Sequence, residues 1–249
     1  MPELAANLVR RHVNVIYAVG VEATLAAKKA TPTIPIVFLM GGDPVGLGIV
    51  SSFSRPVEQI TGINIMAATL SAKRLEMLRE LLPMATTFGF VANPQNQVTK
   101  GEVTAMLAAS QAARLQLHVV NASTVREADG AFGSLVQLKA DAAVLQADPV
   151  FLGERAQIAS IASRHRMPSI YSVRDYIAAG GLMSYGDDRF ESERQTGIYV
   201  SRILKGAKAS DLPIQQPTKF KLIVNLTAAK SISLTIPESF LSRADEVIE

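Results

Sequence analysis

A short apolar stretch that ends in glycines and prolines, residues 34–50 (IPIVFLMGGDPVGLGIV), constrains the fold of this chain most strongly. Its apolar run stops at Gly41-Gly42-Asp43-Pro44. An uninterrupted apolar run bounded by turn residues is typical of a strand buried on both faces of a parallel sheet. Ligands of open α/β sheets bind just past the carboxyl ends of the strands, so we expect Asp43 to lie where a ligand would bind. The alternative is that Asp43 only caps a tight turn.

Strand-like and helix-like segments alternate along almost the whole chain, which predicts right-handed βαβ units and parallel sheets. We expect strands at 13–19, 34–40, 61–65, 87–92, 115–119, 142–146, 168–171, 182–185, 220–225 and 246–248. We expect helices near 4–11, 23–30, 49–54, 71–82, 99–113, 124–138, 151–164, 173–179, 190–205 and 227–233. Ser71 is expected to cap the fourth of these helices, and Thr124 and Glu127 have the spacing of a capping box.

The alternation pauses at 62–70 and again at 180–186. These pauses predict an α/β fold of two Rossmann-like lobes joined by crossing segments, with a cleft between them. Residues 1–65 and 186–218 are expected to form the first lobe, and residues 66–185 and 219–249 the second.

Composition excludes several classes of protein. The 249 residues are 48% hydrophobic, but no apolar run approaches the roughly 18 residues of a membrane helix, so we expect no membrane insertion. The net charge is +3 and the basic residues are scattered, which argues against a nucleic-acid partner. There is no cysteine, so disulfides and thiolate chemistry are excluded. No signal peptide is visible at Met1, which indicates a cytoplasmic protein or a start downstream of the true one.

Three expected strands end in a small polar residue followed by proline: Asp43-Pro44, Asn93-Pro94 and Asp148-Pro149. Such groups at neighbouring strand ends can converge on one cleft. An aspartate suits the ammonium group of a ligand, and an asparagine offers both a donor and an acceptor. The alternative for each pair alone is ordinary turn chemistry.

Four further residues complete the expected ligand site. Gly20 follows a strand and allows close approach of backbone to a ligand, and Thr24 lies one turn beyond it. Tyr171 and Tyr185 lie at strand ends, where an aromatic ring can stack on a ligand; the alternative is that they pack in the interior.

No motif indicates catalysis. The three histidines have no metal-ligand spacing, and His165 is expected at a helix end. Asp187-Asp188 precedes a helix, where capping is the simpler interpretation. Gly46-Leu47-Gly48 lacks the third glycine of a dinucleotide fingerprint, since Ser51 stands there. We therefore expect no catalytic residue, no metal and no cofactor.

Several segments match one known family. They are Asp43-Pro44-Val45-Gly46, Asn93-Pro94, the run 180–186 (GGLMSYG), 203–208 (ILKGAK) with 211–213 (DLP), 216–226 (QPTKFKLIVNL), 234–237 (LTIP) and 243–249 (RADEVIE). The chain resembles the ABC-transporter substrate-binding proteins of the type described as putative tryptophan/tyrosine transport, over nearly its whole length.

The resemblance implies a type I periplasmic-binding-protein fold whose two lobes close on a small molecule, such as an amino acid or another small metabolite. It also implies a periplasmic location and delivery to an ABC permease and its ATPase, with no chemistry on the ligand. Two departures stand out. Family members begin with further βα structure, so the first lobe is expected to be incomplete and to leave Val15, Tyr17 and Ile36 uncovered. Val21-Glu22 replaces a common Thr-Pro pair, which puts specificity for aromatic amino acids in question.

Two other functions remain open from the residues themselves. A ligand-sensing regulatory lobe of the same fold needs a DNA-binding segment, which this sequence does not carry. An α/β enzyme acting through Asp43 or Asp148 is the other alternative, and the empty motif search argues against it.

Overall fold

The chain divides into two α/β units in the computed structural model, which describes residues 1–56 and 59–249. The first unit comprises Met1–Met66 and Asp188–Lys219, and the second comprises Ala67–Asp187 and Phe220–Glu249. The first lobe was expected to comprise residues 1–65 and 186–218, and the first unit comprises residues 1–66 and 188–219. The chain thus passes between the units three times, and the 187/188 passage joins a strand directly to a helix.

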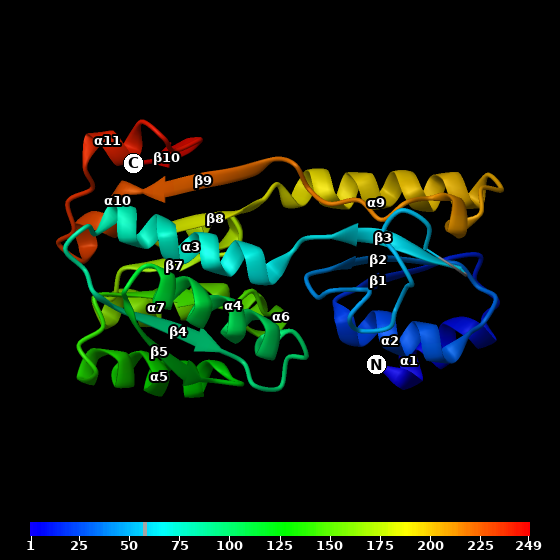
Figure 1. The fold of residues 1–249 in the computed structure, drawn as a ribbon, viewed down its shortest axis with the longest axis horizontal. Helices are drawn as coiled ribbons and strands as arrows, with labels where there is room; N and C mark the ends of the chain where they lie inside the picture. Colours follow the sequence, from blue (N-terminus) through cyan, green and yellow to red (C-terminus); the bar gives the residue numbers. More distant parts are fainter. Residues whose placement is uncertain (57–58) are drawn as a thin grey trace. The chain divides into compact units, whose positions relative to one another are not determined.

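The first unit is built on a three-stranded parallel sheet of β1 (Ile16–Val19), β2 (Ile36–Met40) and β3 (Ile60–Asn64), in that order. Helices α1 (Pro2–Arg10) and α2 (Val21–Ala30) lie on one face of this sheet, and α9 (Arg189–Leu204) lies on the other (Figure 1). Residues of β2 and α9, Val37, Tyr199 and Ile203, form a small core with Leu212. A 3-10 turn, Ala209–Asp211, follows α9.

The outer strand of this sheet is partly uncovered. Tyr17 is 45% exposed and Val19 56% exposed, whereas Ile36 is fully buried. The expected exposure of Tyr17 is therefore confirmed, and Val15 is half-buried. The expected exposure of Ile36 is wrong, because β2 is the central strand and pairs with β1 on one side and β3 on the other.

The second unit contains a seven-stranded sheet in the order β10-β9-β8-β7-β6-β4-β5. Its strands are β4 (Thr87–Ala92), β5 (Gln116–Asn121), β6 (Ala142–Leu145), β7 (Ser169–Tyr171), β8 (Met183–Asp187), β9 (Phe220–Asn225) and β10 (Glu246–Ile248). All neighbours pair in parallel except β8 and β9, which are antiparallel. The prediction of parallel sheets thus needs one correction, because β9 comes back from the first unit and runs against β8.

Helices cover both faces of this second sheet. These helices are α3 (Ala67–Leu81), α4 (Thr99–Ala112), α5 (Val125–Gln137), α6 (Pro149–Gly153), α7 (Arg155–Arg164), α8 (Asp175–Ala178), α10 (Leu226–Ser231) and α11 (Glu238–Leu241). Phe88 and Phe90 of β4 point into a core with α3 and α4, and Val91 points into a second core with α5 and α7. Successive side chains of a strand face opposite sides, so both faces of β4 are apolar.

Some local expectations are confirmed and others are wrong. Thr124 caps α5 by accepting from the Glu127 amide, and Asp188 caps α9, as predicted. The helix expected at 49–54 does not form, and the one expected at 151–164 is two helices that meet at Glu154. Ser71 does not cap α3. The helix begins four residues earlier, and Ser71 is buried inside it.

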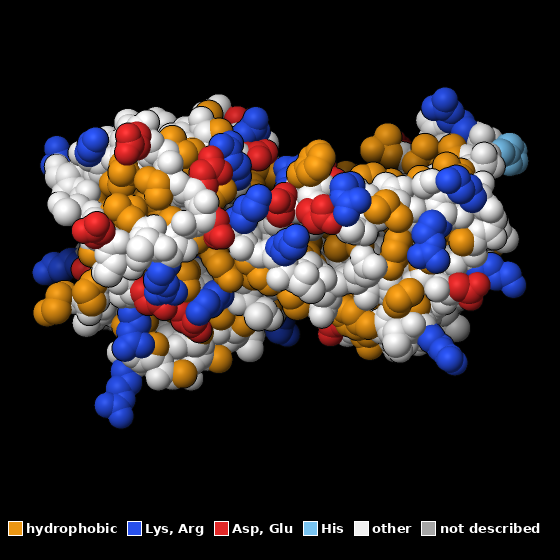
Figure 2. Space-filling view, turned by 90° about the horizontal axis from the view of Figure 1, so that it is seen from above, with side chains coloured by type: hydrophobic (Ala, Val, Ile, Leu, Met, Phe, Trp, Pro, Cys, Tyr) orange, Lys and Arg blue, Asp and Glu red, His pale blue; other side chains and the backbone are white. Residues whose placement is uncertain are grey.

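Charges of both signs are interspersed on the face drawn in Figure 2, with orange apolar side chains between them. Neither sign gathers into a continuous field on that face. Among the described residues, no helix combines the length and apolar character that a membrane span requires.

Candidate functional site

The carboxyl ends of β4 and β6 bring two of the predicted residues into contact in the second unit. Asn93 follows β4 directly, and Asp148 lies just past β6. The Asn93 Nδ2 group donates to Asp148 Oδ2 at 3.1 Å, and Asn96 Nδ2 donates to the same oxygen at 2.8 Å. Two of the three polar-proline turns therefore form one cluster, because β4 and β6 are adjacent parallel strands whose carboxyl ends share an edge of the sheet.

The carboxylate of Asp148 is almost fully engaged within the protein. Its other oxygen, Oδ1, accepts from the amides of Val150 at 2.8 Å and Phe151 at 3.3 Å, which caps α6. The residue is 5% exposed. A carboxylate has about four acceptor sites, and these four bonds occupy them. Asp148 therefore shapes the two loops, and little acceptor capacity is left for a ligand ammonium group.

Asn93 is 4% exposed and Asn96 is half-buried, and within the described residues their side-chain amides donate to Asp148. Each side-chain amide carries two N–H groups, and each gives one to Asp148. The second N–H of Asn93 and of Asn96 can donate to a carboxylate or carbonyl oxygen. The cluster is thus suited to the acceptor groups of a small molecule.

Buried hydrogen bonds to Gln146 and Thr99 fix the backbone of Asn93. The Asn93 amide donates to Gln146 Oε1 at 2.7 Å, and the Thr99 hydroxyl donates to the Asn93 carbonyl at 2.5 Å. Gln146 Nε2 donates to Thr99 Oγ1 at 2.8 Å and to Glu102 Oε1 at 3.2 Å. The sequence analysis did not identify Gln146, Thr99 or Glu102. Gln146 alone carried a signal, because it is the first polar residue after a buried strand.

Two charged residues lie beneath these hydrogen bonds. Glu102 of α4 is fully buried, and Arg74 of α3 is 2% exposed. Burial raises the pKa of the Glu102 carboxyl, against bonds from Ser71 and Gln146 and the attraction of Arg74 that lower it. Burial likewise lowers the pKa of Arg74 to about 10, against the attraction of Glu102 and Asp187. Each charge offsets part of the desolvation cost of the other.

The two predicted tyrosines occupy interior positions in the second unit. Tyr171 is fully buried, and its ring stacks on Tyr176 with centroids 4.6 Å apart. Among the described residues, neither of these two hydroxyls has a hydrogen-bond partner. Tyr185 is half-buried, with its ring 6.1 Å from that of Phe220. The position of Tyr171 gives no support to a ligand contact, and both roles stay predictions.

The other three predicted residues lie in the first unit, at the carboxyl ends of β1 and β2. Gly20 is the N-cap of α2 with φ 86°, a left-handed conformation that favours glycine, and its amide donates to the Leu39 carbonyl at 2.9 Å. The Thr24 hydroxyl is buried and donates to the Gly20 carbonyl at 2.8 Å. Asp43 is exposed, and Oδ1 accepts from the Val45 amide at 3.0 Å. The Asp43 carboxylate is the most accessible polar group of the three, and its ligand contact stays a prediction.

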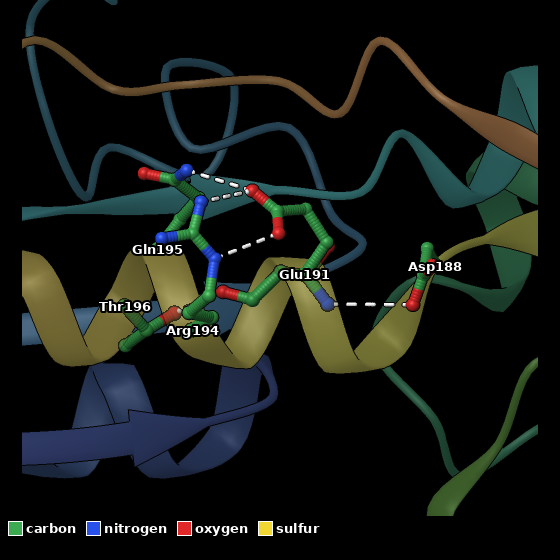
Figure 3. Close-up of polar contacts among 6 residues, drawn as sticks. Asp188, Glu191, Arg194, Gln195 and Thr196 are labelled. Carbon is green, nitrogen blue, oxygen red and sulfur yellow. Dashed lines mark hydrogen bonds and ion pairs between the residues drawn. The ribbon is translucent and has the colours of Figure 1, made fainter.

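The first unit also has a cavity of about 360 Å³ beside the start of α9. It is lined by Ile63, Asp188, Glu191, Ser192, Gln195 and residues 215–219. Figure 3 shows Arg194 and Gln195 directed at the Glu191 carboxylate, with Asp188 at the helix start. The two ion-pair bonds from Arg194 measure 2.8 and 2.6 Å and lower the pKa of Glu191 to about 2. These polar groups form hydrogen bonds with one another on this side of the cavity.

No group of three or more metal-ligating side chains occurs in the parts of the chain at 1–56 and 59–249. Two α/β units with largely parallel sheets, between which the chain passes three times, define a type I periplasmic-binding-protein-like fold.

The family follows from comparison with known proteins. Residues 3–248 match the family model of ABC transporter substrate binding proteins, and the chain belongs to that family. A tyrosine-binding protein of Clostridioides difficile is 24% identical over 231 residues, which is 93% of this chain and 66% of that protein. This chain thus spans just under two thirds of the length of that curated relative.

Two solved structures share the fold closely. A conserved domain protein from Vibrio cholerae is 25% identical with a TM-score of 0.90, and the alignment covers 99% of this chain and 84% of the other. An ABC domain in complex with L-Trp from Streptococcus pneumonia is 23% identical with a TM-score of 0.88, over 99% and 85% of the two chains.

Proposed function

We propose that this chain is the solute-binding component of an ABC importer and that its ligand is an amino acid. The observation that carries this proposal is the cluster of Asn93, Asn96 and Asp148 at the ends of β4 and β6. It holds two amide donors rigidly at the edge of the sheet where ligands of this fold class bind. A free amino acid carries the carboxylate that such donors recognise.

The choice of amino acids over sugars is supported by two relatives. One is described as a tyrosine-binding protein, and another is in complex with L-Trp. Asp43, Gly20, Thr24, Tyr171 and Tyr185 stay proposed ligand contacts, and the exposed Asp43 carboxylate suits an ammonium group.

The proposal includes partners and a location. The chain would hand its ligand to a membrane permease powered by an ATPase, from the periplasmic or extracellular side of the membrane. It would perform no chemistry on the ligand. Family membership supports both statements, since proteins of this family are named for binding substrates of ABC transporters.

A thermal-shift screen of the purified chain tests the ligand class. The panel contains the proteinogenic amino acids and, as a matched group, glucose, galactose and allose. A ligand at 100 times its dissociation constant stabilises the bound form by about 2.7 kcal/mol, which is a shift of several degrees. We expect one or more amino acids to raise the melting temperature in a saturable way. A response to sugars alone would overturn the amino-acid proposal, and no response to either group would count against solute binding.

A further inference from the structure

A buried arginine in the second unit touches the segment through which the chain leaves that unit. Arg74 Nε donates to the carbonyl of Tyr185 in β8 at 2.7 Å, and Nη1 donates to Ser71 Oγ at 3.3 Å. Tyr185 lies two residues before Asp187, where the second unit ends and the chain passes to α9. Arg74 itself belongs to α3, whose first residue, Ala67, is where the chain enters the second unit. One side chain thus links the entry helix to the exit strand.

The same arginine begins a continuous series of buried bonds to the candidate site. Ser71 Oγ donates to Glu102 Oε2 at 2.5 Å, and Gln146 Nε2 donates to Glu102 Oε1 at 3.2 Å. Gln146 Oε1 then accepts from the Asn93 amide at 2.7 Å. The series therefore runs from the exit strand to the asparagine proposed to bind the ligand.

The exit strand packs closely against its neighbours beside Arg74. A Cβ atom on Gly186 would stand 1.9 Å from the Ser172 carbonyl oxygen and 3.7 Å from Arg74 Nη2. The backbone at Gly186 thus lies close to the Ser172 carbonyl, with the guanidinium within ordinary contact distance of the same position. Displacing either contact leaves a buried polar group without a partner, which is costly in a low-dielectric interior.

We infer that Arg74 is a positioning residue that couples the exit strand β8 to the Asn93 loop. Its two bonds diverge from one planar fork, so they fix the strand carbonyl and Ser71 together. A lysine would keep the charge and lose this geometry, because an ammonium group is a single point donor on a flexible stem. The inference predicts that loosening Arg74 also loosens residues 93–99, although its described hydrogen bonds go to Tyr185 and Ser71.

Hydrogen exchange measured by mass spectrometry tests the coupling without any ligand. The variant is Arg74→Lys, and the control is Arg79→Lys, an exposed arginine on the same helix. We expect Arg74→Lys to speed exchange by about tenfold in peptides that span Met183–Asp187 and in peptides that span 93–99. Peptides from α5 and α7 should keep their rates, and Arg79→Lys should change none. Unchanged rates at 93–99, or an equal acceleration throughout the second unit, would overturn the coupling.

A second variant keeps the test decisive if Arg74→Lys fails to fold. Glu102→Gln preserves the shape of the central link and removes its charge. We expect it to change exchange at Met183–Asp187 and at 93–99 together. A change at only one of these two segments would contradict a continuous link.

The consequence for binding rests on the proposed function. Calorimetric titration with L-tyrosine should show at least fivefold weaker affinity for Arg74→Lys than for the wild type, with Arg79→Lys unchanged. Equal affinities in the presence of coupled exchange would limit Arg74 to a structural role and overturn this part. If the wild type itself does not bind L-tyrosine or any other amino acid, the proposed function fails, and the exchange experiment still decides the coupling.

Discussion

Asn93 and Asp148 lie 55 residues apart in the sequence and are joined by a 3.1 Å hydrogen bond in the interior of the second unit. Each precedes a proline and follows a buried strand. The bond ties two loops at the same edge of the sheet into one rigid element. Under the proposed function, these loops are preorganised for the ligand, because little ordering is left to be done on binding.

Replacing Asp148 by asparagine should destabilise the protein. Both oxygens of Asp148 accept from N–H groups, so the side-chain nitrogen of an asparagine would replace one of these acceptors with a donor. In either orientation, that N–H would face the N–H groups of Asn93 and Asn96 or the backbone amides at the start of α6. We expect the free energy of unfolding to fall by about 1–3 kcal/mol, measured by urea denaturation.

Asp43→Asn is the matched control, since Asp43 also precedes a proline. It is exposed, and its Oδ1 accepts a hydrogen bond from the Val45 amide at 3.0 Å, which an asparagine oxygen can also accept. We expect a change within about 0.5 kcal/mol for this control. Equal effects of the two substitutions would show that the buried bonds of Asp148 contribute nothing specific.

Gly186→Ala should be among the most damaging small substitutions in the second unit. The added methyl would collide with the Ser172 carbonyl oxygen, a backbone atom that cannot rotate away. We expect the free energy of unfolding to fall by about 2–4 kcal/mol. Gly101→Ala serves as the comparison, because Gly101 lies within α4 and a Cβ there would meet nothing within 4 Å. That substitution should raise stability by up to about 1 kcal/mol, and a loss of stability there would contradict this account.

Glu102→Gln should change how stability depends on pH. Burial raises the folded-state pKa of Glu102 above 4.5, so the folded chain holds this proton more tightly than the unfolded chain does. The contribution of Glu102 to stability is therefore fully present below about pH 4.5 and is lost as the pH rises through the folded-state pKa. The glutamine variant does not titrate at this position, so its free energy of unfolding does not fall with pH for this reason.

The measurement is urea denaturation of both proteins at several pH values from 4.5 to 8. The free energy of unfolding of Glu102→Gln, relative to the wild type, should rise with pH and then level off. This rise should exceed the one seen for Glu76→Gln, the control at an exposed position of α3. A pH-independent difference for Glu102→Gln would mean that the Glu102 carboxyl keeps its ordinary pKa in the fold.

The sequence predicted the α/β architecture because its strands and helices alternate and their apolar patterns are local. Caps such as Thr124 and Asp188 were also predictable, since a cap is a relation between residues three apart. The antiparallel pairing of β8 with β9 was not, because a strand carries no local signal of its neighbour. The burial of Ile36 was not predicted for the same reason. Ile36 is buried because β2 lies between β1 and β3, and the order of strands in a sheet cannot be read from a single strand.

The candidate site was predictable only at its rim. Asn93 and Asp148 follow strands and precede prolines, which is a local pattern. Arg74, Ser71 and Glu102 lie within helices and look like surface residues in the sequence. Ser71 was even assigned to a helix start, because serine is a frequent cap, although α3 begins at Ala67. Their burial arises from the packing of α3 and α4 on the sheet, a relation that no short window of sequence contains.

Calorimetric titration of the purified chain with L-tyrosine and L-tryptophan tests the central claim most directly. The account predicts saturable binding of at least one of them with a stoichiometry near one, and weaker binding by Asn93→Ala at unchanged fold. Absence of binding by both, and by every other amino acid of the screen, from a chain that unfolds cooperatively would contradict it.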